Sequence, residues 1–178
     1  MKRILLILLV FCVLLVSPLV ASSFDYSLFW GPAIMDFTYP GVSMSYGMNF
    51  GLTKSLELSL WGASTLTPKF FGDNRLGLEL DYALLGVRSN GTAVAGSGIN
   101  MLVGGGIMAS TNNSYNLFIP TDVFLSLSTL TVGNPILERR ERLAKLVVSY
   151  NWFQNKVGVI FNIALFDYYL TGTWRDYR

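Results

Sequence analysis

The chain has 178 residues, of which 52% are hydrophobic and 14% aromatic, while only 13% are charged. Its 13 basic and 11 acidic residues give a formal net charge of +2, so there is no electrostatic reason to expect nucleic acid as a partner. The sequence has no histidine, and its one cysteine is Cys12. Serine–histidine and cysteine–histidine catalysis and histidine-rich metal sites are therefore excluded, and we expect no cofactor.

The N-terminal segment has the organisation of a secretory signal peptide. Lys2 and Arg3 give a basic start, residues 4–16 are apolar, and Val20-Ala21-Ser22 offers small residues for cleavage. The apolar run is too short for a helix that crosses a bilayer, which needs about 20 residues. We expect residues 1–22 to be cleaved and residues 23–178 to form a single β-barrel domain.

Eight stretches alternate between large apolar and small or polar residues, which is the period of a β-strand. In the first, residues 24–39, the alternation loses its phase at Gly31-Pro32, where we expect a bulge. The last stretch puts Val159, Phe161, Ile163 and Leu165 on one face. The seven stretches after the first cover residues 42–52, 55–65, 75–87, 93–110, 117–132, 144–152 and 157–170.

The pattern is clearest in the second and third stretches. Even positions from Val42 to Leu52 carry large apolar side chains, and odd positions carry small or polar ones. The polar segment Thr53-Lys54-Ser55 separates this run from the next, as in a β-hairpin. Residues 133–142, which include three arginines, are interpreted as a turn between two later strands.

These features predict an all-β protein, an eight-stranded antiparallel up-and-down transmembrane β-barrel. A secreted chain that is apolar and aromatic, yet has no segment long enough for a spanning helix, is typical of proteins that cross a membrane with strands. Such a barrel turns its large apolar residues toward lipid. We expect the outward face to include Met44, Tyr46, Met48, Leu58, Leu78, Leu80, Val103, Leu125, Leu146, Val148 and Phe161.

The same phase directs charged residues into the lumen, where acids outnumber bases. Like charges in a poorly hydrated space repel one another, so we expect each base to contact several acids. We assign this cluster no catalytic role and no metal. The expected lumen cluster comprises Asp36, Glu57, Glu79, Asp81 and Asp122 with Lys145 and Arg75.

A signal peptide, eight alternating strands and hairpins such as MNFGLTKSLELSLWGAS resemble the small outer-membrane β-barrels of diderm bacteria, namely the outer-membrane protein W type or the membrane domain of outer-membrane protein A. The resemblance implies the cell outer membrane as the location. It also implies outer-membrane lipids and the barrel-assembly machinery as partners, and a porin-like path for a small solute. The chain departs from the pattern in its short loops and in ending on Arg178 rather than an aromatic residue.

Three functions are open at this stage. A non-catalytic barrel would have a structural role or a narrow lumen or pocket for small or apolar solutes. A secreted soluble lipid-binding barrel, like a lipocalin, would turn the same alternation inward and leave few charges on its surface. A lipid-modifying barrel enzyme would lack the usual histidine base. We expect the first function, and no enzyme activity.

Overall fold

The computed structural model describes residues 25–36, 41–53, 55–67, 70–85, 101–110, 119–134 and 139–171. The predicted signal peptide and the last residues of the chain, 172–178, lie outside the described residues. Within the described ranges, no helix is long and apolar enough to cross a membrane.

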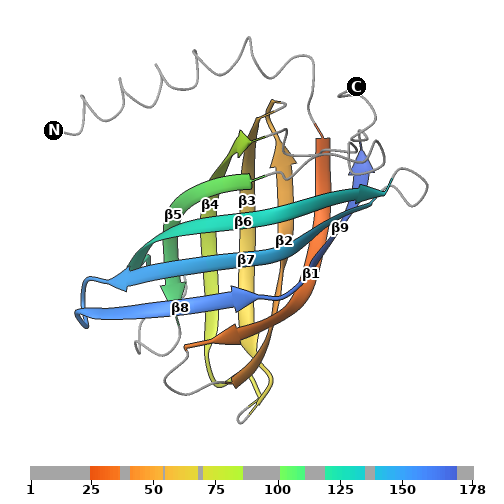
Figure 1. The fold of residues 1–178 in the computed structure, drawn as a ribbon. Coiled ribbons are helices and arrows are strands. Elements are labelled where there is room, and N and C mark those ends of the chain that lie inside the picture. Colours follow the sequence, from red (N-terminus) through yellow and green to blue (C-terminus); the bar gives the residue numbers. More distant parts are fainter. Residues whose placement is uncertain are drawn as a thin grey trace, which may run out of the picture.

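The strands of the described residues close into an antiparallel barrel (Figure 1). β1 pairs with β2 on one side and with both β8 and β9 on the other, so β8 and β9 are two halves of the eighth strand position. The prediction of an all-β, eight-stranded antiparallel barrel is therefore confirmed. The strands are β1 Asp25–Met35, β2 Gly41–Gly51, β3 Leu56–Thr65, β4 Asn74–Leu85, β5 Met101–Ser110, β6 Asp122–Asn134, β7 Arg139–Asn151, β8 Lys156–Asn162 and β9 Leu165–Thr171.

The alternation of the sequence decides which side chains face inward. β4 is the clearest case, because Leu76, Leu78 and Leu80 are exposed while Glu79 and Asp81 between and beside them are buried. Successive side chains of a strand point to opposite faces, so each apolar residue on the outside places a small or polar neighbour inside. The outward positions predicted for β2, β4, β6 and β7 are exposed or half-buried in the structure.

A β-bulge interrupts the eighth strand position, opposite the Gly31-Pro32 segment of β1. Ala33 pairs with Asn162 on one side of the bulge and Trp30 pairs with Phe166 on the other, so the last strand has one more residue than β1 here. Pro32 has no N–H to donate to a ladder, and a Cβ at Gly31 would collide with the Ala164 carbonyl. β1 itself runs through Gly31-Pro32 in unbroken register with β2, so the bulge expected in the first strand lies instead in the last one.

The bulge inverts the facing of the residues that follow it. Ile160 and Asn162 are buried before it, whereas Leu165 and Asp167 are buried after it. The prediction that Leu165 shares the outward face of Phe161 is therefore wrong. An extra residue in one strand shifts every later side chain to the opposite face.

β6 and β7 form a longer hairpin than the sequence indicates. Their pairing continues to Asn134 and Arg139, so only residues 135–138 separate the strands, and the predicted turn over residues 133–142 is wrong. Arg142 lies inside β7 with an exposed fraction of 2%. A charged run at a strand end looks like a solvated turn in the sequence because its buried partners lie on distant strands.

Apolar side chains fill one level of the lumen, between two charged levels. Trp61 and Phe124 meet edge to face across this level, with ring centroids 5.5 Å apart. Gly77 leaves room for the Trp61 ring, which a Cβ at that position would contact at 2.8 Å. This apolar layer comprises Phe29, Ala33, Met35, Trp61, Ala63, Met108, Phe124, Val147, Ile160 and Leu165.

Candidate functional site

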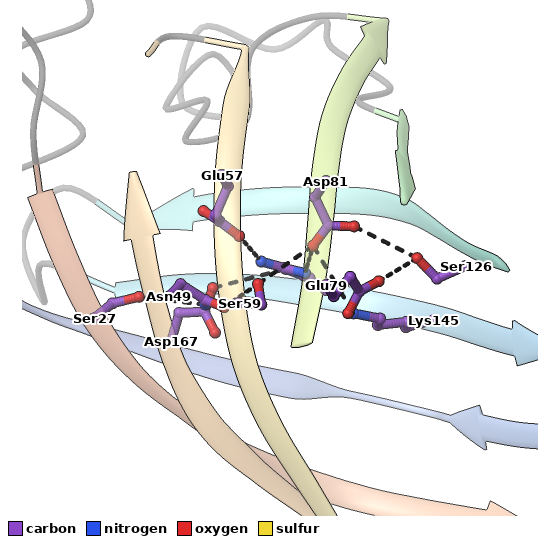
Figure 2. Close-up of polar contacts among 10 residues, drawn as sticks. Ser27, Asn49, Glu57, Ser59, Glu79, Asp81, Ser126, Lys145 and Asp167 are labelled. Carbon is purple, nitrogen blue, oxygen red and sulfur yellow. Dashed lines mark hydrogen bonds and ion pairs between the residues drawn. The ribbon is translucent and has the colours of Figure 1, made fainter. Parts of the chain in front are cut away.

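Six charged side chains from β3, β4, β7 and β9 meet in the lumen beyond the apolar layer, toward the end at which β3 begins. Each has an exposed fraction of 4% or less. Figure 2 shows Glu57 of β3, Glu79 and Asp81 of β4, and Lys145 of β7 directed toward one another. We call this group the lumenal network, and it comprises Glu57, Glu79, Asp81, Arg142, Lys145 and Asp167.

Arg142 is the branched centre of the lumenal network. Its guanidinium forms an ion pair with Glu57, and its Nη1 lies 3.5 Å from Asp81 Oδ2. Its Nε lies 3.7 Å from Asp167 Oδ2. A guanidinium suits this position because its five donors fan out in one plane and can serve several carboxylates.

Lys145 neutralises the other half of the network. Its Nζ lies 2.6 Å from Glu79 Oε2 and 3.9 Å from Asp81 Oδ2. Both Lys145 and Arg142 face inward although they are three residues apart, so strict alternation breaks between them. The hydroxyl of Ser126 donates a hydrogen bond to Glu79 from the neighbouring wall.

The glycine of β5 at position 104 provides the space that these carboxylates occupy. A Cβ added to Gly104 would collide with carboxylate oxygens of Asp81 and Glu79 and with the Ser126 hydroxyl. In the structure, a missing side chain on β5 is part of how two acids of β4 fit inside the wall.

Neutral polar side chains extend the network toward β1. Ser59 donates to Asn49 Oδ1 at 2.7 Å and lies 3.4 Å from Asp81 Oδ2. Asn49 in turn donates to Ser27 Oγ at 3.3 Å. These hydrogen bonds join β1, β2, β3 and β4 on the lumenal side, which gives buried polar groups the partners that burial requires.

Arg75 forms a separate cluster on the other side of the apolar layer. Its guanidinium pairs with Asp36, and its Nε and Nη2 lie 3.0 Å and 2.9 Å from Asp73 Oδ2. Asp73 also accepts a hydrogen bond from Ser110 at 3.0 Å, and Asp36 accepts one from the Val159 N–H at 3.0 Å. The cluster therefore ties β4 to the end of β1 and to β8.

The seven residues expected to share one lumenal cluster thus lie in three places. Glu57, Glu79, Asp81 and Lys145 are together, whereas Arg75 and Asp36 are together elsewhere. Asp122 belongs to neither group, because its Oδ1 accepts from Thr121 at 2.7 Å and from Asn151 at 2.5 Å. The expectation of a single cluster is corrected on this point, since facing the same lumen does not place residues at the same level along it.

Three charged residues of the lumen were not predicted from the sequence. Asp73 stands two positions before Arg75, so extending the alternation of β4 into the preceding segment would have found it. Arg142 was assigned to a turn. Asp167 lies beyond the bulge, and nothing local in the sequence shows that the facing has changed.

The chemistry available to the lumenal network is electrostatic. Its four carboxylates face two basic groups, and the contacts connect walls that are far apart in the sequence. Among the described residues, no group of histidine, cysteine, aspartate or glutamate side chains is arranged to hold a metal ion. The arrangement can fasten strands across the lumen and exclude solutes from the space that it fills.

Comparison with known proteins finds similarity among solved structures only. No family model matches the chain, and no curated protein matches it. Among solved structures, it is similar to the N-terminal β-barrel domain of OprF from Pseudomonas aeruginosa, with 13% sequence identity and a TM-score of 0.48. That match covers 82% of this chain and 100% of the OprF domain. The likeness is too weak to indicate what the chain does.

Proposed function

We propose that the chain is a membrane-spanning β-barrel of the outer membrane of a diderm bacterium, with a structural, non-catalytic role. The observation that supports this proposal is the inverted distribution of polarity. On β4, Leu80 is 47% exposed while Glu79 and Asp81 on either side are 1% and 0% exposed. Water would favour the opposite arrangement, whereas lipid favours this one.

The dimensions of the outward apolar surface fit a bilayer. β4 has 12 residues. At a rise of about 3.4 Å per residue and a tilt of about 40°, such a strand spans about 30 Å along the barrel axis, close to the thickness of a hydrocarbon core. Exposed leucines occupy its outer face from Leu76 to Leu84. A lipocalin-like soluble barrel would expose this face to water, so we prefer the membrane-spanning function.

The structural role rests on the contents of the lumen. The lumenal network, the apolar layer and the Arg75 cluster follow one another along it. Arg142 and Glu57 come from β7 and β3, which are four positions apart among eight and therefore stand on opposite walls. Eight-stranded barrels have interiors just wide enough for side chains to fill. We infer that side-chain contacts across the lumen hold the walls of the barrel together. We also infer that the protein interacts with outer-membrane lipids and the barrel-assembly machinery.

Cell fractionation combined with gel migration tests the location. The proposal requires the protein to be found with outer membranes, to need detergent for extraction and to migrate differently before and after heating. Recovery as a soluble periplasmic or secreted protein would contradict it.

A narrow solute path is the second candidate function, because the lumenal face of β2 carries only the small side chains of Ser43 and Ser45 beside the apolar layer. Liposome swelling with glycerol and with a disaccharide distinguishes the two functions. A structural barrel gives swelling no faster than empty liposomes with either solute, whereas a narrow path admits glycerol alone.

A further inference from the structure

The turns at one end of the barrel expose large aromatic side chains, beside polar ones such as Gln154 and Asn155. We call this end of the barrel the Phe71 end. The connections that follow β1, β3, β5 and β7 lie at this end. Phe70 and Phe71, after β3, are 66% and 54% exposed, with ring centroids 4.3 Å apart. Trp152 and Phe153, after β7, are 42% and 53% exposed. Because these four side chains are exposed, packing inside the barrel does not explain their presence.

The backbone at Phe71 strengthens this observation. Phe71 has a φ of 53°, in the left-handed region that a bulky side chain rarely adopts. Gly72, which would suit that conformation, is the next residue. Backbone hydrogen bonds hold this conformation, because the Phe71 N–H donates to the Thr65 carbonyl at 2.8 Å, whereas the ring itself is exposed and points to a contact outside the protein.

Charges are scarce in the same four connections. By sequence, residues 36–41, 66–73, 111–121 and 152–155 contain only Asp36, Lys69 and Asp73 as charged side chains. Arg75 pairs with Asp36 and Asp73, which leaves Lys69 as the one charge of these segments outside that cluster. An end that projected into water as soluble loops would be expected to carry more charge than this.

The apolar outer wall of the barrel extends to the level of these turns, where Lys156, the first residue of β8, is also exposed. The outward residues nearest this end on β2, β4, β6 and β8 are all apolar and between 37% and 69% exposed, namely Val42, Leu76, Val123 and Val157. The medium that surrounds the outer wall, which we propose is lipid, can therefore also contact the turns. The turns after β3 and β7 lie on different sides of the barrel, at the bottom and at the left of Figure 1.

We propose that the Phe71 end lies flush with one surface of the membrane, with Phe70, Phe71, Trp152 and Phe153 inserted among lipids at headgroup level. Aromatic rings are favoured at this depth because they combine a large apolar area with tolerance of polar neighbours. A docked protein would cover one side of the barrel, whereas lipid surrounds it and can contact both turns. This inference rests on the proposed function and adds to it the position of one end relative to the bilayer.

Single-cysteine labelling of the mature chain, which has no native cysteine if residues 1–22 are removed, tests the proposal. Phe71→Cys and Phe153→Cys place an environment-sensitive fluorophore in the two turns. Leu78→Cys serves as the mid-strand control, and Ser55→Cys serves as the control in the polar turn at the opposite end. The purified full barrel is reconstituted in phosphatidylcholine vesicles that contain lipids with a nitroxide quencher at a shallow or a deep acyl position.

The expected result is blue-shifted emission at positions 71 and 153, quenched more by the shallow nitroxide than by the deep one. The label at position 78 should be quenched more by the deep nitroxide, and the label at position 55 by neither. Emission at positions 71 and 153 that matches position 55 would overturn the proposal while leaving the proposed function intact. Water-like emission at position 78 would instead overturn the proposed function. Two turns are labelled so that a folding defect in one variant leaves the other informative.

Discussion

Arg142 of β7 and Glu57 of β3 form an ion pair across the lumen, between walls that stand on opposite sides of the barrel. The two residues are 85 positions apart in the sequence. Both side chains are almost fully buried, so neither charge can be solvated if its partner is lost. The pair therefore links opposite walls of the barrel, and its loss should destabilise the whole barrel.

Removing one member of this pair should be costly. Arg142→Met would leave the carboxylates of Glu57, Asp81 and Asp167 without their guanidinium, and breaking a buried pair in this way typically costs about 3–5 kcal/mol. Adding Glu57→Gln should recover part of the loss, since it removes one of the uncompensated charges. Urea titration of the barrel folded in vesicles measures both effects. A double variant no more stable than Arg142→Met alone would contradict the expectation that Glu57 is left with an uncompensated charge.

A charged substitution on the outward face tests whether that face contacts lipid. Leu78→Arg should destabilise the barrel in a bilayer by about 2–4 kcal/mol, because the side chain would lie near the midplane of the lipid. Ser55→Arg is the matched control, since it places the same charge in a polar turn and should change stability by less than about 1 kcal/mol. The free energy of unfolding in vesicles is the measurement. Equal behaviour of the two variants would mean that position 78 does not face lipid.

The stability of a Lys145→Met variant should depend on pH. Without the ammonium group, Glu79 would be a buried carboxylate whose charge has lost its partner, and protonation of Glu79 would relieve this. The folded variant would then bind more protons than the unfolded chain, so its stability should fall as pH rises. Thermal melting of the variant relative to wild type should therefore show a larger deficit at pH 8 than at pH 5. An equal deficit at both pH values would indicate that solvent reaches Glu79.

Gly104 provides a test of the packing around the acids. Gly104→Ala should lower the melting temperature, because the added methyl would collide with Asp81 and Glu79, which Lys145 and Arg142 hold in place. Gly105→Ala is the neighbouring control. Its methyl would meet only the Leu125 side chain and the Phe124 carbonyl, each at 3.2 Å. The prediction fails if the two variants melt at the same temperature.

The sequence predicted the fold well because the period of 2 is a local signal. On β4 and in the first part of β2, the facing of each residue follows directly from its position in the alternation. The lumenal network was only partly predictable, since Arg142 and Asp167 depend on features that are not local. Arg142 is identified as lumenal only by partners on β3, β4 and β9, and Asp167 only by a bulge whose length the sequence does not specify.

The bulge also connects the seam of the barrel with the lumenal network. β1 and β9 meet along the seam where the first and last strands join, and there Phe29 pairs with Asp167. Without the extra residue of the bulge, Asp167 would face lipid and Tyr168 would face the lumen. The bulge therefore brings Asp167 within reach of Arg142, whose strand β7 pairs with β9. One inserted residue thus supplies the lumenal network with its fourth carboxylate.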